Sequence, residues 1–484
     1  MDISPSLAQA SEQAPGFARV PVYLTLPESV RDPLAAFLTL KSLSHHAYIL
    51  ESLEGRDKRG RYTFLGYDPS MEISALDGQL SIKGAASFTI ETSDPGSYIA
   101  QIVAENHAPR NPSLPPFTGG LVGYFGFDYI KYAEPTLKLD APDEEGFRDL
   151  DLMVFERVIA YDHVEGLIYL VVSIRTDNLE ANYRRAQVEL NALAEVLRSG
   201  AQAAPEPLRL TSDFVPLFNQ DRFVAMVAKA KEHIIEGDIF QVVLSNRLAA
   251  TCEGNLFDTY VRLRDINPSP YMFYFSSDDM EMAGASPETL VRASDGEVFT
   301  FPLAGTRPRG KTDAEDQLLE AELLADEKEL AEHNMLVDLG RNDIGKIAEF
   351  GTVRVERYLN VERYSHVMHI GSTVRGTLRP DVSPLEVIAA VLPAGTLSGA
   401  PKIMACQIIN DLEQCKRGIY GGALGYVSFS GDTDVCIAIR LAYKKNGRVF
   451  VRSGAGIVAD SQPVSEYAEC NNKAAAVVAA LRGE

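Results

Sequence analysis

The sequence of 484 residues contains no tryptophan and only five cysteines. The cysteines are an odd number without Cys-x-x-Cys spacing, and they stand at positions 252, 406, 415, 436 and 470. This pattern argues against a disulfide framework or a structural zinc site and favours a reducing compartment. No run approaches the roughly 18 uninterrupted apolar residues of a membrane-spanning helix, so we expect no such helix.

Positive charge is also scarce, with 46 Lys and Arg against 67 Asp and Glu and a formal net charge of −21. A surface of this sign repels nucleic acid and anionic lipid, so we expect neither as a partner. It also means that an anionic substrate needs a local cation to hold it. Residues 1–5 lack the basic and apolar regions of a signal peptide, so we expect a cytoplasmic protein.

The order of the expected elements favours a mixed α+β architecture. Two β-type runs at 158–161 and 167–172 flank a turn and predict a hairpin, and helical spacing predicts helices at 177–198, 220–236 and about 465–482. Strand groups and helices do not alternate strictly, so we do not expect a Rossmann sheet. A small, polar, proline-bearing segment indicates a domain boundary. We therefore divide the chain into a flexible tail (1–17), an N-terminal domain (18–198), a linker (199–215) and a C-terminal domain (216–484).

Two glycine-rich runs, at 119–124 and 421–426, resemble each other. Neither has the Gly-x-Gly-x-x-Gly spacing, so they do not indicate nucleotide binding. We interpret them as strands in which glycine allows another backbone to approach closely.

Two Glu-x-x-Glu pairs are candidates for metal binding: Glu329 with Glu332, and Glu466 with Glu469. On a helix, this spacing places both carboxylates of a pair on one face. Four carboxylates brought together would make a hard oxygen site suited to Mg²⁺. A single pair is more often a solvated helix surface, because Glu is rarely buried. The spacing alone leaves both interpretations open.

Acid–base and anion-binding groups also have two interpretations each. His369 lies in an alternating apolar run and is either a buried core histidine or a general acid or base. Glu288 follows Ser-Pro and lies either in a turn or near other carboxylates that keep it protonated. Glycine-rich loops at 302–310, 393–402 and 453–457 are either tight turns or backbone cradles for an anion.

Taken together, ten segments of the C-terminal part resemble the chorismate-utilising enzymes. Each segment is weak evidence alone, but ten in one order are specific. The N-terminal half resembles the family more loosely, through 49–52 and 61–66. The resemblance implies a two-lobed α+β fold with antiparallel sheets packed in a sandwich and helices on the outside. The segments are 240–245, 285–288, 304–309, 328–333, 367–370, 393–402, 420–422, 437–440, 453–457 and 466–469.

The resemblance implies a Mg²⁺ site built from the two glutamate pairs. Glu332 and Glu469 are similar to direct metal ligands, with Glu329 and Glu466 completing the shell partly through water. The metal would hold the ring carboxylate of chorismate and so provide the positive site that the acidic chain otherwise lacks.

Further roles follow from the same resemblance. Glu288 is similar to the acid that helps the C4 hydroxyl leave while ammonia attacks C2. His369 is similar to the residue that serves the second step, in which C2 loses a proton and pyruvate departs. Substrate contacts are implied for Gly305, Thr306, Tyr420, Arg440, Gly454, Ala455, Gly456 and Lys473.

Three positions sort the chain within the family. Gln241 stands where water-using members carry a lysine base, so ammonia is the expected nucleophile. Ala304 stands where aminodeoxychorismate synthases typically carry a nucleophilic lysine, and Thr396 is similar to the anthranilate type. The expected product is therefore anthranilate, with aminodeoxychorismate as the alternative.

An aminating enzyme needs a source of ammonia. A glutaminase domain would show a nucleophilic cysteine in a glycine-rich elbow, and none of the five cysteines has that context. We therefore expect a glutamine amidotransferase on a separate chain, in a heterodimer or heterotetramer.

A second resemblance within the family concerns its tryptophan feedback site. The alternative is a structural strand followed by a proline turn. If the site is real, tryptophan and chorismate would favour different interdomain arrangements and be coupled reciprocally. The implied residues are Glu51, Ser52, Arg61, Pro270, Tyr271, Met272 and Cys436.

Overall fold

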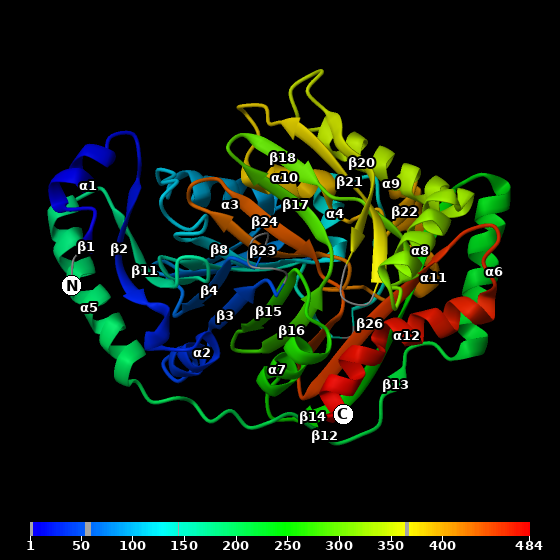
Figure 1. The fold of residues 1–484 in the computed structure, drawn as a ribbon, viewed down its shortest axis with the longest axis horizontal. Coiled ribbons are helices and arrows are strands. Elements are labelled where there is room, and N and C mark those ends of the chain that lie inside the picture. The colour runs from blue at the N-terminus through cyan, green and yellow to red at the C-terminus, as the bar shows by residue number, and fades with distance from the viewer. Residues whose placement is uncertain (1–2, 54–59, 144, 364–366) are drawn as a thin grey trace.

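Two large antiparallel β-sheets form the centre of the molecule, and helices lie around them (Figure 1). The structure, a computed structural model, describes residues 3–53, 60–143, 145–363 and 367–484. One buried apolar cluster contains side chains of both sheets, including Tyr48 and Phe273 from one and Tyr124 and Leu424 from the other. The two sheets therefore pack face to face, and the α+β sandwich implied by the family resemblance is confirmed.

The larger sheet has 14 strands. Its strands come from both ends of the chain, and its centre is the pairing of β3 with β15. The strand order is β1 (Ile3–Ser4), β2 (Arg19–Pro27), β11 (Leu167–Arg175), β10 (Arg157–Asp162), β4 (Tyr62–Tyr67), β3 (Ala47–Glu51), β15 (Tyr271–Ser276), β16 (Met280–Ser286), β25 (Leu441–Lys445), β26 (Arg448–Ile457), β14 (Gln241–Glu253) and β12 (Arg209–Leu210), while β13 (Val215–Pro216) and β22 (Gly399–Ala400) also pair with β14.

The smaller sheet has 12 strands. Here the two parts of the chain meet where β8 pairs with β23. The strand order is β19 (Leu303–Pro308), β21 (Val367–Thr377), β18 (Glu297–Thr300), β17 (Thr289–Ser294), β24 (Thr433–Ile437), β23 (Ala423–Ser428), β8 (Gly120–Phe125), β9 (Leu150–Phe155), β5 (Met71–Leu76), β6 (Gln79–Lys83) and β7 (Phe88–Glu91), while β20 (Arg354–Arg363) also pairs with β21.

The segment 199–215, expected as a linker, separates two parts of the chain that share both sheets. It runs along the lower edge of the molecule in Figure 1 as an extended stretch that includes β12. On either side of it, Glu51 pairs with Met272 in the larger sheet and Gly123 pairs with Gly425 in the smaller one. Each proposed domain therefore contributes half of each sheet.

The two similar glycine-rich runs lie on β8 and β23 and pair with each other. A Cβ atom on Gly123 would lie 2.0 Å from the Asp151 carbonyl oxygen, and one on Gly425 would lie 2.1 Å from that of Asp434. Their interpretation as strands with close backbone approach is confirmed.

Most helices cover the outside of the sheets (Figure 1). The predicted hairpin is confirmed as β10 and β11, and helix α6 has the predicted bounds because Asn219 caps its start and Gly237 ends it in a left-handed conformation. No helix in the described ranges is long and apolar enough to cross a membrane. The helices are α1 (Leu7–Gln13), α2 (Pro33–Lys41), α3 (Pro95–Ala104), α4 (Ile130–Ala133), α5 (Leu179–Ser199), α6 (Gln220–Glu236), α7 (Phe257–Ile266), α8 (Asp313–Ala325), α9 (Glu327–Gly345), α10 (Pro384–Val391), α11 (Lys402–Glu413) and α12 (Pro463–Arg482).

The N-terminal residues differ from the expected flexible tail. Ile3 pairs with Leu24 in the larger sheet, and α1 follows directly. A capping box between Ser6 and Gln9 starts this helix, and Ala10 is fully buried. The small, polar composition of the segment concealed both features.

Candidate active site

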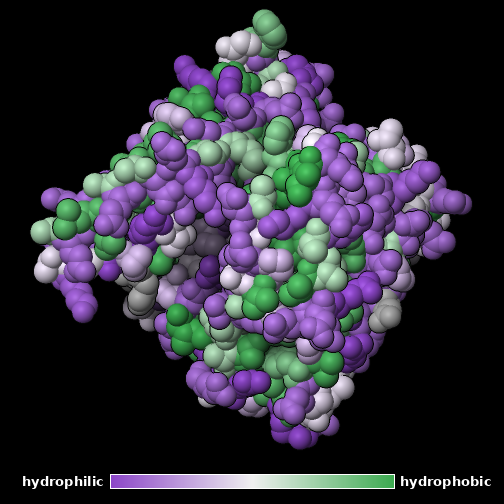
Figure 2. Space-filling model, turned by 90° about the vertical axis from the view of Figure 1, so that its right-hand side faces the viewer, coloured by the Kyte–Doolittle hydropathy of each residue, from purple (hydrophilic) through white to green (hydrophobic). Residues whose placement is uncertain are grey.

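The candidate active site lies where α9 packs on β19 and β21 and α12 packs on β26. Figure 2 shows this side of the molecule, which is hollowed near its middle and mostly hydrophilic around the hollow. Nearly all residues that the sequence implicates in chorismate chemistry come from these elements or from the loops at their ends.

The two glutamate pairs lie on α9 and α12 and influence the same lysines. Burial and the neighbouring Glu329 raise the pKa of Glu332, while burial and Glu469 raise the pKa of Glu466. Lys328 and Lys473 oppose both shifts in pKa, so the pairs face a common space. The chain comes close to Glu329 at Gly305, where a Cβ atom would lie 3.2 Å from the carboxylate oxygen Oε2.

The glutamate site was tested against the chemistry of a divalent cation. Its donors are hard carboxylate oxygens, and two of them have raised pKa values because negative charge gathers there. Among the described residues, these glutamates do not bring three ligand atoms within 4.8 Å of one another, and Lys473 lies 2.7 Å from Glu469. The donor set therefore fits Mg²⁺, and the lysine occupies part of the charge balance that a cation would change.

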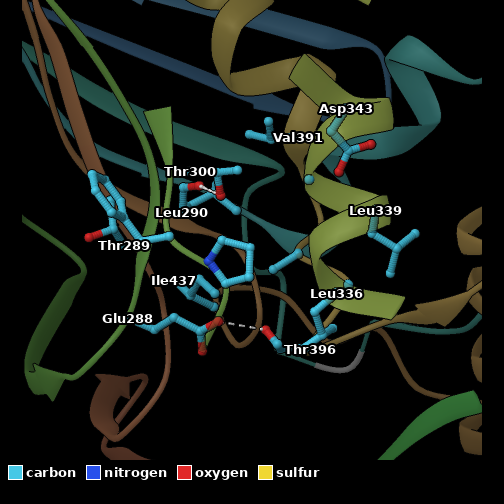
Figure 3. A pocket seen from close by; sticks show the side chains of 15 residues that line it. Glu288, Thr289, Leu290, Thr300, Leu336, Leu339, Asp343, Val391, Thr396 and Ile437 are labelled. Atoms are coloured by element: carbon cyan, nitrogen blue, oxygen red, sulfur yellow. Dashed lines mark hydrogen bonds between the residues drawn. The ribbon is translucent and has the colours of Figure 1, made fainter. Parts of the chain in front are cut away.

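Glu288 lies in the loop between β16 and β17 and bonds to the loop that follows α10. Its Oε1 accepts a hydrogen bond of 3.1 Å from the Thr396 hydroxyl (Figure 3). Burial raises the pKa of Glu288 to about 7, against smaller lowering effects of Thr396 and Lys473. A carboxyl group of this kind exchanges its proton near neutral pH, which suits a general acid.

His369 projects from the opposite face of β21 to its core neighbours. Met368 and Ile370 are fully buried, whereas His369 is only partly buried, so the interpretation as a core histidine is wrong. Its Nδ1 donates to the Gly305 carbonyl at 2.8 Å and lies 3.1 Å from the Thr306 hydroxyl. Burial lowers the pKa of the imidazole, which leaves a neutral ring with its lone pair on Nε2.

The glycine-containing segment of β26 forms another wall. Gly454 pairs with Ser245 on β14, and its carbonyl accepts a bond of 3.2 Å from Lys473. A Cβ atom on Gly454 would lie 2.8 Å from the Tyr420 hydroxyl, and one on Gly456 would lie 2.7 Å from Gln241 Nε2. Glycine is therefore required at both positions for these polar side chains to reach the strand.

Gln241 is 4 % exposed, and its Oε1 accepts no hydrogen bond from the described residues. Its side chain bonds to Glu332 and thereby lowers the pKa of that carboxyl. The amide thus joins β14 to the glutamate pair of α9 and keeps one acceptor oxygen available.

Arg440 stands in a left-handed conformation between β24 and β25, at φ 52°. No carboxylate in the described parts of the chain pairs with it, although it influences the pKa of His369. Desolvation lowers the pKa of its guanidinium. An arginine without a counter-ion in such a recess is suited to bind an anion.

Sequence reasoning missed a buried charge network beneath the site. Glu413 on α11 is 1 % exposed and bonds to Arg417, Arg452 and the Ser245 backbone. Arg417 also donates to the Leu397 and Val243 carbonyls, each at 2.6 Å. The network therefore fastens the Thr396 loop to β14. The spacing of Glu413 and Arg417, four residues apart, was the only sequence signal.

A second cavity, of about 200 Å³, lies between the two sheets, and we call it the effector cavity. All seven residues predicted for the feedback site line it: Glu51, Ser52, Arg61, Pro270, Tyr271, Met272 and Cys436. Aromatic walls are provided by Tyr62, Phe64, Phe273 and Tyr426, and charged groups by Glu51, Arg61, Arg292 and Asp434.

Comparison with known proteins identifies the family. A family model described as chorismate binding enzyme matches residues 45–479. The chain is 42 % identical over 487 residues to anthranilate synthase component 1 of Aquifex aeolicus, which covers 99 % of this chain and 98 % of the relative. It is 43 % identical over 482 residues to the component 1 of Acinetobacter calcoaceticus, with 96 % of each covered.

Solved structures agree with this assignment. Anthranilate synthase component I from Streptococcus pneumoniae TIGR4 matches with a TM-score of 0.77 and 39 % identity over 93 % of this chain and 98 % of that one. The menaquinone-specific isochorismate synthase from Escherichia coli has a TM-score of 0.71 over 98 % and 100 % of the chains, but its 19 % identity concerns the fold alone. The chain belongs to the chorismate-binding enzymes and, within that family, to the anthranilate synthase component 1 group.

Proposed function

We propose that the chain aminates chorismate at C2 with loss of the C4 hydroxyl and then eliminates pyruvate to give anthranilate. The observation that carries this proposal is Glu288, a carboxylic acid with a pKa of about 7 that Thr396 holds in the recess near Lys473. The step needs a proton donor near neutral pH, and Glu288 has the required protonation state.

In the first step, the nitrogen lone pair of ammonia forms a bond to C2 while the ring double bond shifts and the C4–O bond breaks. Glu288 gives its proton to the departing hydroxyl, which leaves as water. The bound ammonium then loses a proton to solvent. Gln241 supports ammonia as the nucleophile, because its amide cannot act as the base that an attacking water would need.

In the second step, C2 loses its proton and the bond between C3 and the enolpyruvyl oxygen breaks. His369 is the base for this proton, because its Nδ1 is fixed on the Gly305 carbonyl and its Nε2 carries the lone pair. The ring becomes aromatic, and the departing enolpyruvate takes up a proton to become pyruvate.

The substrate is a dianion, and the site offers two places for carboxylates. Arg440 and Tyr420 bind the enolpyruvyl carboxylate, and backbone groups of Gly305 and Gly454 line the space between. Glu329, Glu332, Glu466 and Glu469 hold Mg²⁺, which when bound supplies the positive charge that the ring carboxylate needs.

The test is a product assay with chorismate, Mg²⁺ and ammonium, followed by glutamine with a partner glutaminase chain. We expect anthranilate and pyruvate in equal amounts from ammonium alone. Aminodeoxychorismate without anthranilate would support the alternative function. Ala304 favours anthranilate, because the nucleophilic lysine of the alternative chemistry is absent from this position.

We also propose that the effector cavity binds tryptophan and inhibits the reaction. Its aromatic walls suit an indole ring, while Arg61 and Glu51 offer charges for a carboxylate and an ammonium group. Because the chain has no tryptophan, the ligand is the only indole emitter, so binding can be titrated by fluorescence. Ser52→Phe fills the cavity and should abolish both binding and inhibition. An unchanged spectrum and unchanged activity at millimolar tryptophan would reject the site.

A further inference from the structure

A small inner cavity of about 50 Å³ lies directly behind the catalytic carboxyl group. Figure 3 shows it between α9 and the start of β17, with Glu288 and Thr396 at one end and Asp343 and Val391 at the other. Its side walls are largely apolar and include Leu290, Leu336 and Leu339. The chemistry described above uses only the end formed by Glu288 and Thr396.

The far end of the inner cavity is a buried ion pair close to the protein surface. Asp343 Oδ2 accepts a bond of 2.7 Å from Lys402, whose ammonium also donates to the Val391 carbonyl at 2.8 Å. Lys402 is 8 % exposed, but its chain neighbours Pro401 and Ile403 are exposed. The end wall is therefore one side chain thick.

We propose that this inner cavity holds one molecule of neutral ammonia on its way from the partner chain to C2 of chorismate. The inference rests on the proposed function, because only an aminating enzyme needs such a site. The cavity is larger than the roughly 10–15 Å³ that a water-sized molecule requires. Ammonia released at the Lys402 end would reach the reacting centre without crossing bulk solvent.

The walls favour ammonia over ammonium. Transfer of a cation from water into a largely apolar cavity carries a high desolvation cost, whereas a small neutral molecule pays little. The ammonium group of Lys402 adds repulsion at the entrance end. The cavity thus preserves the lone pair that attacks C2.

The test fills the inner cavity with the variant Leu339→Phe. Leu339 belongs to no catalytic or binding group, and it is packed closely against the opposite loop, because a Cβ atom on Gly395 would lie 2.6 Å from its Cδ1. A phenyl ring at this position has to extend into the cavity. Val391→Met is a second filling variant from another wall. Leu318→Phe is the matched control, since Leu318 on α8 is 66 % exposed.

Glutamate and anthranilate are measured together with glutamine and the partner glutaminase, and anthranilate is measured separately with saturating ammonium. We expect one anthranilate per glutamate for the parent and for Leu318→Phe. Both filling variants should make severalfold more glutamate than anthranilate, because released ammonia escapes. Their ammonium-driven activity should be kept, since dissolved ammonia enters through the cleft that admits chorismate.

A ratio of one in both filling variants overturns the proposal. Equal loss of the glutamine-driven and ammonium-driven activities in both variants also overturns it, because the cavity would then be part of the reacting centre itself. Failure of the parent chain to make anthranilate from ammonium is a different result, since that outcome rejects the proposed function as a whole.

Discussion

The pKa of Glu288 can be moved by removing its one side-chain hydrogen bond. The value of about 7 lies above the ordinary 4.5, which corresponds to about 3 kcal/mol of preference for the neutral form. The Thr396 hydroxyl donates to the ionised carboxylate and so opposes this preference. A hydrogen bond to a charged group contributes about 1.5–3 kcal/mol, so Thr396→Val should raise the pKa by about 1 to 2 pH units.

The sign follows from the role of Glu288 as an acid. A general acid works while protonated, so kcat/KM for chorismate falls as pH rises through its pKa. In Thr396→Val the alkaline limb should therefore move upward in pH. The assay measures anthranilate formation across the alkaline range at a fixed concentration of unprotonated ammonia, which removes the titration of the nucleophile itself.

Thr300→Val is the matched control for this shift. Thr300 lines the same inner cavity, but its hydroxyl donates to the Leu290 carbonyl and makes no bond to Glu288. Its profile should keep the alkaline limb of the parent. An unmoved or lowered limb in Thr396→Val, or an equal shift in both variants, would remove Glu288 from the role of acid.

The remaining predictions concern the metal, the second step and regulation. Glu332→Gln and Glu469→Gln should raise the Mg²⁺ concentration needed for half-maximal activity by at least tenfold and weaken Mg²⁺ binding in calorimetry, and unchanged titrations would reject the metal site. His369→Ala should bind chorismate but accumulate the aminated intermediate, which chromatography detects, and normal anthranilate output would exclude it. Thr289→Val should reduce the factor by which tryptophan weakens chorismate binding, and an unchanged factor would show that Thr289 carries none of the coupling.

Local sequence patterns predicted the elements that local interactions determine. The bounds of α6 follow from its cap residues Asn219 and Gly237, and the hairpin of β10 and β11 follows from two β-type runs around a turn. The seven residues of the effector cavity were placed together by family resemblance, and they do line one cavity although the chain separates them by hundreds of positions.

Long-range packing could not be predicted in the same way. The linker at 199–215 suggested two separate domains, but strand pairing such as Gly123 with Gly425 depends on contacts that no short window contains. The same holds for Glu413, whose complete burial becomes favourable only because Arg417 and Arg452 surround it from two other places in the chain. Sequence reasoning also placed His369 in the core by default, because alternation does not say which face is covered.

The prediction for Thr289 rests on how closely the two cavities approach each other. Tyr271 lines the effector cavity, and its hydroxyl lies 2.9 Å from the Thr289 hydroxyl. Thr289 lines the inner cavity and directly follows Glu288 in the chain. A ligand that displaces Tyr271 therefore acts on the catalytic carboxyl through one hydrogen bond and one peptide unit.

A second connection runs through the neighbouring strand. Cys436 lines the effector cavity, and the backbone N–H of the next residue, Ile437, donates to the Glu288 carbonyl at 3.0 Å. Both routes end at Glu288, so tryptophan can oppose chorismate without a change in the interdomain arrangement. Linkage requires chorismate to weaken tryptophan binding by the same factor that tryptophan weakens chorismate binding. In Thr289→Val both factors should fall together, which fluorescence titrations with and without chorismate can measure, while the hydrogen bond from Ile437 maintains the part of the coupling that remains.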